Sequence, residues 1–241
     1  MQNIRIYAFA DEASSKVDEQ IVAMRRNGLN GLEVRGVDGQ NISVITAEKA
    51  KELKQKLDDA GLVTWSVGSP IGKVKLEDDF NAHLEKFKRT LELANILDAG
   101  NLRLFSFFMP ADVPAENFTD EVIDRMGKFV ELAEGSGVAL CHENEKGIYG
   151  DIAERCVTIH KALPQIKGIF DPANFVQCDE DTLKAWEMLK PYIHYMHIKD
   201  ALTDGTVVPA GQGAGEADGG VAMGGNGDFI SGVDQIQIAH Q

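Results

Sequence analysis

Short apolar runs alternate with amphipathic segments along most of the chain. Within residues 80–97, Phe80, Leu84 and Phe87 recur three or four positions apart, which is the spacing of one helix face. Apolar runs predict strands at residues 4–10, 31–34, 62–67, 102–107, 138–140, 166–170 and 193–198. Amphipathic segments predict helices at residues 17–29, 47–60, 80–97, 121–134, 151–163 and 181–189.

Strands that are apolar on both faces and separated by amphipathic helices are typical of parallel sheets with right-handed crossovers. Seven such strands and six helices in about 200 residues favour an α/β fold of the TIM (β/α)8 type. A doubly wound open sheet is the alternative. No GxGxxG sequence follows the first strand, which weighs against a dinucleotide-binding sheet.

The end of the chain departs from this alternation. Ten of the 24 glycines lie at 205–241, where strand-like pieces are confined to about 229–238. We therefore predict a barrel at 1–213 that lacks a normal eighth βα unit, followed by a loosely ordered, glycine-rich tail at 214–241. The seam between the first and seventh strands would be covered by a short strand within 229–238, by direct contact of the two strands, or by a second copy in a homo-oligomer.

Polar residues at strand ends form the active face of such a barrel. Glu143, Asp171 and His197 follow three successive predicted strands. Two carboxylates and an imidazole suit Mn²⁺, Mg²⁺, Co²⁺ or Zn²⁺. Each residue alone has an ordinary reading as an ion pair, a turn residue or a core histidine. Their occurrence at three successive strand ends favours a metal site instead, because an apolar strand rarely ends in a buried charge.

Other residues at these ends are weaker candidates. Lys199 lies two positions after His197 and faces the same interior, so it either contacts substrate or pairs with Glu143. Glu33 and Arg35 are substrate-binding candidates at the end of the second strand. The remaining polar residues predicted for this face are Asp11, Glu12, Ser66, Ser69, Arg103 and Ser106. His142 points toward the helices, and His83 and His160 are predicted to lie on the surface.

Charge and composition limit the partners. A formal net charge of -14 repels a phosphate backbone, so nucleic acid is not an expected partner. The chain has no run of about 18 apolar residues and no signal-peptide pattern at its start, so we expect a cytoplasmic protein without a membrane partner. Its three cysteines show no CxxC spacing, so no thiolate metal site is indicated.

Four stretches together resemble a known family. HENEKGIYGD at 142–151, FDPANFVQ at 170–177, YMHIKDA at 195–201 and VVPAGQG at 207–213 are similar to the sugar phosphate isomerase/epimerase family of xylose isomerase-like TIM barrels. The resemblance covers about residues 4–213. It implies one divalent ion held by Glu143, Asp171, His197 and a further glutamate from the last strand. Asn174 would stand where relatives carry a histidine or asparagine that touches metal-bound water or substrate.

The resemblance also implies a type of reaction. Members of the family, which is related to ketose 3-epimerases and inosose dehydratases, move a proton beside a carbonyl through an enediolate. The leading hypothesis is therefore a metal-dependent isomerase or epimerase of a small sugar or sugar phosphate, with Glu143 and Lys199 as catalytic residues. Because the tail lacks the expected glutamate, the alternative is a non-catalytic or severely impaired barrel. An apurinic endonuclease is a more distant alternative.

Overall fold

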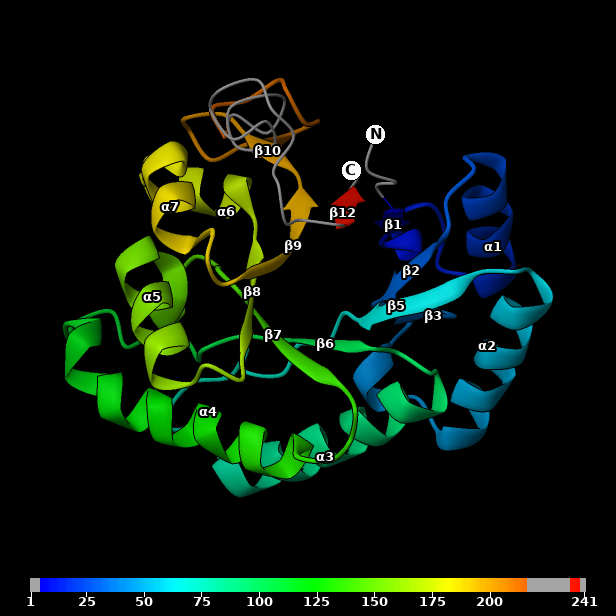
Figure 1. Cartoon of the computed structure of the whole chain (residues 1–241), viewed down its shortest axis with the longest axis horizontal. Helices are drawn as coiled ribbons and strands as arrows, with labels where there is room; N and C mark the ends of the chain where they lie inside the picture. The colour runs from blue at the N-terminus through cyan, green and yellow to red at the C-terminus, as the bar shows by residue number, and fades with distance from the viewer. Residues whose placement is uncertain (1–4, 216–234, 239–241) are drawn as a thin grey trace.

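The computed structural model describes residues 5–215 and 235–238, and its centre is a closed barrel of parallel strands (Figure 1). The strands follow the order β1-β12-β9-β8-β7-β6-β5-β2 around the barrel. Their bounds are β1 Arg5–Ala8, β2 Gly31–Val34, β5 Val63–Val67, β6 Asn101–Leu104, β7 Ala139–Glu143, β8 Lys167–Phe170, β9 Ile193–Ile198 and β12 Gln235–Ile238. The predicted TIM-barrel fold is confirmed.

Helices connect the strands and surround the barrel (Figure 1). They are α1 Val17–Arg26, α2 Ala47–Asp59, α3 Phe80–Ile96, α4 Thr119–Ala133, α5 Ala153–Ala162 and α7 Thr182–Leu189, with a short α6 at Pro172–Val176. Side-chain caps fix several starts: Thr46 accepts the amide of Lys49, and Asp181 accepts the amide of Lys184. All six predicted helices are present within a few residues of their predicted bounds.

Two strands end three residues away from their predicted ends, β7 and β6. β7 runs on to Glu143 instead of ending at residue 140, because Cys141 and His142 stay paired with β6. β6 ends at Leu104 instead of residue 107. The next residues turn toward the β5–α3 connection, where the Phe105 amide donates to the carbonyl of Ile71 at 2.8 Å. Phe107 has a positive φ of 66°, which no strand residue adopts.

The seam between β1 and β9 is filled by β12. Residues 235–238 pair in parallel with β1, where Arg5 faces Gln235, and with β9, where Met196 faces Ile236. Of the three predicted ways to cover the seam, the short strand within 229–238 is the one observed. The rest of the predicted loose tail, at 216–234 and 239–241, lies outside the described residues. In the described stretch after β9, the chain forms a hairpin of β10 Asp200–Ala201 and β11 Val207–Val208.

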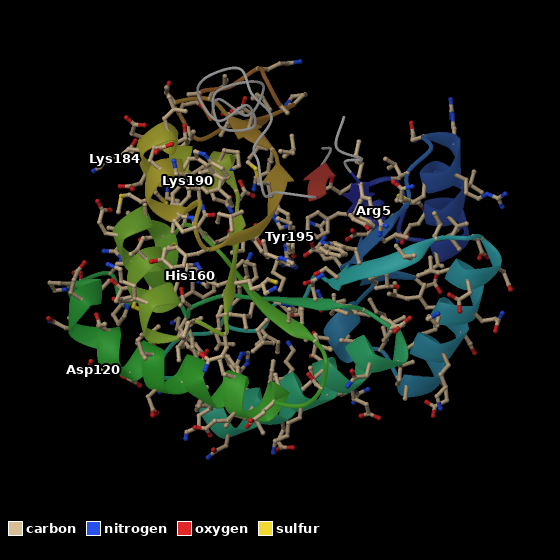
Figure 2. All side chains as sticks on the ribbon, in the orientation of Figure 1. Arg5, Asp120, His160, Lys184, Lys190 and Tyr195 are labelled. Carbon is tan, nitrogen blue, oxygen red and sulfur yellow. The ribbon has the colours of Figure 1, made fainter. Side chains whose placement is uncertain are left out.

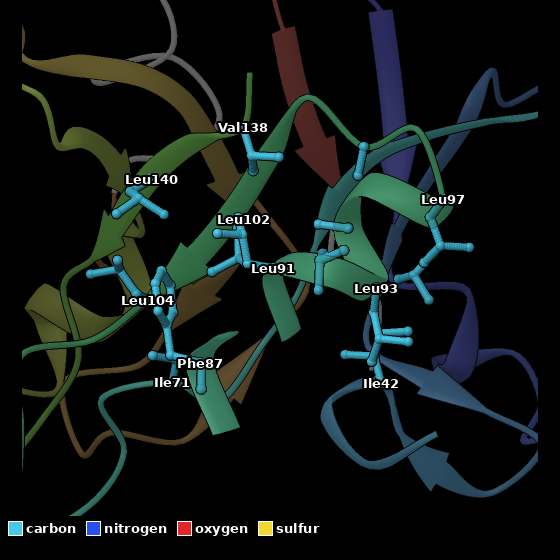
Figure 3. Close-up of a cluster of buried hydrophobic side chains, with 14 of the residues drawn as sticks. Ile42, Ile71, Phe87, Leu91, Leu93, Leu97, Leu102, Leu104, Val138 and Leu140 are labelled. Atoms are coloured by element: carbon cyan, nitrogen blue, oxygen red, sulfur yellow. The ribbon is translucent and has the colours of Figure 1, made fainter. Parts of the chain in front are cut away.

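The main hydrophobic core lies between the barrel and the helices. Figure 3 shows one part of it, where α3 packs against β6 and β7. The side chains labelled there are Ile42, Ile71, Phe87, Leu91, Leu93, Leu97, Leu102, Leu104, Val138 and Leu140. Leu102 and Leu104 are fully buried, and each such side chain contributes about 1.5–3 kcal/mol. Among the described residues, the helices lack the combination of length and apolarity needed to cross a bilayer.

Two histidines predicted on the surface are buried, so that prediction was wrong. His83 on α3 accepts the amide of Gly72 at Nε2, at 2.9 Å. His160 on α5 pairs through Nδ1 with the carbonyl of Ile166 at 3.1 Å and stacks on Tyr192. Each ring finds a polar partner on the buried face of its helix. In Figure 2, by contrast, Lys184 of α7 lies at the outer edge of the molecule.

Candidate metal centre

Three strand ends bring Glu143, Asp171 and His197 together. Glu143 ends β7, Asp171 follows β8 as the N-cap of α6, and His197 lies near the end of β9. Because β7, β8 and β9 are neighbouring parallel strands, their carboxyl ends meet at the same end of the barrel. One ligand atom of each residue lies within 4.8 Å of the others, and all three side chains are buried. The predicted convergence is therefore present in the structure.

The individual ligand atoms face one another. His197 Nδ1 lies 2.9 Å from Glu143 Oε1 and 3.9 Å from Asp171 Oδ2. Asp171 Oδ1 accepts the amide of Asn174 at 3.1 Å, and Oδ2, which also pairs with Lys199 at 2.9 Å, is the oxygen that faces the cluster. Asn144 joins the β7 and β8 ends, since its side-chain amide exchanges two 2.9 Å hydrogen bonds with the backbone of Asp171. Sequence reasoning gave Asn144 no role.

The electrostatics of the cluster favour a cation. Burial lowers the pKa of His197, but the charges of Glu143 and Glu33 outweigh it and raise that pKa to about 9. The proton on His197 is therefore a positive charge held between carboxylates. Buried carboxylate and imidazole donors are also a set that Mn²⁺, Co²⁺ or Zn²⁺ accepts. A divalent ion would take over the position of that proton, so the residues fit a metal ion.

Arg103 holds the other oxygen of Glu143. Its guanidinium donates to Glu143 Oε2 at 3.0 Å, to the carbonyl of Gly68 at 3.2 Å and to that of Ser69 at 3.4 Å. The guanidinium also lies 5.1 Å from the ring centroids of both Phe9 and Phe105. Burial would raise the pKa of Glu143, but His197 and Arg103 hold it well below its usual value. Glu143 is therefore a carboxylate.

Arg103 was predicted to lie at the active face without a specific role. A stronger signal was present in the sequence, because a charge between Leu102 and Leu104 must face the inside of the barrel and needs a partner there.

Lys199 pairs with Asp171 rather than with Glu143, the partner considered from the sequence. Its Nζ lies 2.9 Å from Asp171 Oδ2 and donates to Asn174 Oδ1 at 2.8 Å. Burial would lower the pKa of Lys199, but Asp171 and Glu143 raise it, so the side chain is an ammonium. Asn174 in turn donates to the carbonyl of Asn144 at 2.8 Å and approaches Glu143 Oε1 at 3.5 Å. Lys199 and Asn174 thus both border the candidate centre.

Glu33 lies beneath His197 in the barrel interior. Its Oε2 is 3.2 Å from His197 Nε2 and accepts the hydroxyl of Tyr195 at 3.1 Å. Tyr195, labelled in Figure 2, is itself fully buried. Metal-binding histidines usually donate their second ring nitrogen to such a carboxylate, which fixes the ring orientation. Glu33 Oε1 is buried without a hydrogen-bond partner among the described residues.

Arg35, the other substrate-binding candidate, directly follows β2. Its contacts are with residues other than Glu143, Asp171 and His197. It pairs with Asp11 at 2.8 Å and Glu12 at 3.3 Å, and it stacks on Phe9 at 4.6 Å. Phe9 in turn contacts the ring of His197, with centroids 5.1 Å apart.

Among the described residues, three side chains of the cluster could serve as metal ligands. The resemblance implied a fourth from the last strand, but the sequence of β12 is QIQI and contains no carboxylate. Three protein ligands leave open positions for water or substrate.

A TIM barrel with a buried Glu–Asp–His cluster at the carboxyl ends of its strands is the class of protein that these observations define. The chain belongs to the xylose isomerase-like TIM barrel family, whose profile matches residues 21–222. A comparison with curated protein sequences finds no significant match.

Solved structures show the same fold at low sequence identity. The probable 3-DHS dehydratase AsbF from Bacillus anthracis has a TM-score of 0.76 and 17% identity, with 99% of this chain and 92% of that chain covered. The IOLI protein, solved with a binding zinc atom, has a TM-score of 0.78 and 14% identity, with 98% of this chain and 88% of that chain covered. A D-psicose 3-epimerase with D-tagatose from Clostridium cellulolyticum H10 has a TM-score of 0.68 and 14% identity, with 98% of this chain and 84% of that chain covered.

Proposed function

We propose that this chain is a divalent-metal-dependent isomerase or epimerase that moves a proton next to the carbonyl of a small sugar through an enediolate. The observation that carries the proposal is the buried cluster of Glu143, Asp171 and His197 within 4.8 Å at the active end of the barrel. The sugar epimerases among the structural neighbours support it, as does the zinc atom in the IOLI structure.

Glu143, Asp171 and His197 would hold the ion, which when bound polarises the substrate carbonyl. Glu143 is the proton acceptor, because Arg103 keeps it ionised. Lys199 remains an ammonium and donates a hydrogen bond to a substrate oxygen. Asn174, which lies against both Lys199 and Glu143, orients the sugar hydroxyl that enters between them. Glu33 fixes the ring of His197 from below.

A second candidate is a barrel that binds a ligand without catalysis. It is favoured by one observation, namely that β12 has the sequence QIQI where the family resemblance implies a metal-binding glutamate. Epimerisation needs a group to return the proton as well as one to remove it, and the absent carboxylate is the natural second group. The two candidates differ in whether carbon-bound protons exchange with solvent.

The test is proton exchange in heavy water. Ketoses are incubated with the purified chain and Mn²⁺, Co²⁺ or Zn²⁺, and NMR records the loss of the proton beside the carbonyl. We expect exchange that requires the metal and that falls at least about 100-fold in Glu143→Gln, since general base catalysis contributes that much. Glu121→Gln is the matched control, because Glu121 pairs with Arg125 on the outer helix α4.

Equal exchange in Glu143→Gln and the wild-type chain would refute the assignment of the base. Metal binding without exchange for any ketose would favour the non-catalytic barrel.

A further inference from the structure

Asp200 is a buried carboxylate at the active end of the barrel that is not part of the metal cluster. It follows Lys199 directly, and its exposure is 0%. Its carboxylate accepts four backbone amides. Oδ1 accepts those of Ala201 at 2.9 Å and Gly215 at 2.8 Å, and Oδ2 accepts those of Gly211 at 3.0 Å and Gly213 at 2.9 Å. All the lone pairs that face the loop are therefore used.

The glycines of the loop at 209–215 are required by this arrangement. A Cβ on Gly213 would lie 2.4 Å from both the carbonyl oxygen of Ala201 and Oδ1 of Asp200. A Cβ on Gly215 would lie 2.8 Å from Asp200 Oδ1, and Gly211 has a φ of +81°. The loop is thus wrapped around the carboxylate so closely that only glycine fits.

Converging backbone amides in a glycine-rich loop normally form an anion-binding concavity for phosphate. In TIM barrels, phosphate sites often lie in the loops that follow the last two strands. The loop at 209–215 follows β9, the seventh strand along the chain, and it has this geometry. Here the anion is the chain's own Asp200. A phosphate would have to displace a buried carboxylate and leave it without partners, which costs several kcal/mol.

The loop also borders the candidate centre. A Cβ on Gly215 would lie 3.2 Å from Cβ of Pro172, the residue that follows the ligand Asp171. Gln177, just past α6, donates to the carbonyl of Gly205 at 3.0 Å and holds the β10–β11 hairpin on the same side. Whatever binds beside Asp171 and Lys199 therefore meets this loop.

Four cations around the centre are paired with carboxylates. Arg35 pairs with Asp11, Lys73 with Glu145, Arg103 with Glu143, and Lys199 with Asp171, at 2.8–3.0 Å. A metal ion would take the place of part of this pairing at Glu143 and Asp171, but Arg35 and Lys73 would keep their carboxylates. At these four positions, the positive charge is balanced locally rather than offered to an anionic substrate.

We propose that Asp200 is an internal anion which fills the glycine-rich loop beside the metal cluster, so that the site accepts an uncharged sugar and excludes its phosphate. This inference rests on the proposed function for the identity of the substrate. The filling of the loop is a separate physical claim that can be tested without turnover.

The first experiment measures the binding of inorganic phosphate by calorimetry to the whole chain without added metal. The wild-type chain shows no binding, whereas Asp200→Ala, in which four amides are freed, binds phosphate with a Kd of about 1 mM or below. Asp181→Ala is the matched control, because it removes a carboxylate that accepts a backbone amide at the start of α7, far along the chain from the loop. We expect the control to bind no phosphate.

Phosphate binding by the wild-type chain, or its absence in a folded Asp200→Ala chain, would overturn the proposal. Asp200→Ser, which removes the charge and most of the side-chain volume but keeps one acceptor for the loop, replaces the alanine variant if that chain does not fold, and it must also gain phosphate binding. The second experiment compares D-fructose with D-fructose 6-phosphate as competitors for the metal-loaded wild-type chain. We expect the phosphate to bind at least about tenfold more weakly. Tighter binding of the phosphate contradicts the proposal.

The two proposals fail in different ways. If no sugar exchanges a proton, the isomerase proposal is refuted. The phosphate measurements on the wild-type chain and the Asp200 variants still test whether Asp200 fills the loop. If sugars exchange but the wild-type chain binds phosphate, only the inference about Asp200 falls.

Discussion

Removing the guanidinium of Arg103 tests whether the stability of the cluster depends on pairing its buried carboxylates with a cation. In Arg103→Met the side chain still fills the space between Phe9 and Phe105, but Glu143 and Glu33 lose their cation. Breaking a buried ion pair by deleting one partner costs about 3–5 kcal/mol. Three hydrogen bonds to buried acceptors and two cation–π contacts are lost with it. We therefore expect the free energy of unfolding to fall by about 4 kcal/mol in the absence of metal.

The assay is urea denaturation followed by circular dichroism, with and without saturating Zn²⁺ or Mn²⁺. A divalent ion bound to Glu143 supplies positive charge to the carboxylate, so metal should recover part of the loss in Arg103→Met. Arg125→Met is the control, because Arg125 also pairs with a glutamate and lies 4.9 Å from the ring centroid of Phe80, but it does not contact the cluster. A loss below about 1 kcal/mol, or one that metal leaves unchanged, would refute this account of the site.

Three further predictions concern single residues. Glu33→Gln should weaken metal binding about tenfold, because the partner of His197 Nε2 loses its charge; chelator competition measures this, and unchanged affinity contradicts it. Burial, assisted by Lys86, lowers the pKa of His83 to about 4, so between pH 6.5 and 4 the unfolded chain binds a proton that the folded chain excludes. Stability should fall by up to about 3 kcal/mol as the pH drops through this window, and His83→Gln should remove that part of the decline in denaturation curves; an identical decline in both chains contradicts it. Gly72→Ala should destabilise the chain by at least about 2 kcal/mol in urea, because its Cβ would lie 1.9 Å from the carbonyl oxygen of Phe105 at a φ of +88°; wild-type stability in the variant would show that the backbone shifts freely there.

The sequence allowed the elements, and the convergence of three polar strand ends, to be predicted because both depend on local patterns. Glu143, Asp171 and His197 each end an apolar run, and parallel strand ends must meet. The supporting contacts depend instead on barrel closure. Glu33 on β2 reaches His197 on β9 across the barrel interior, and Arg103 on β6 reaches Glu143 on the neighbouring strand β7. No spacing along the chain encodes which of these inward-facing residues become partners. His83 and His160 were misplaced because a polar residue on an amphipathic helix carries no local sign of a buried partner.

The short strand β12 also has a consequence for how the molecule assembles. Its partners are β1 and β9, so β1 gains its second neighbour from a segment almost the whole chain away. Contacts this distant form late, because loop closure must be completed before they contribute. Until then β1 and β9 present unpaired backbone at their edges, which invites association between chains. The sensitivity of this protein to aggregation during refolding should therefore depend on residues 235–238 more than on any helix, although those residues are a minute fraction of the barrel.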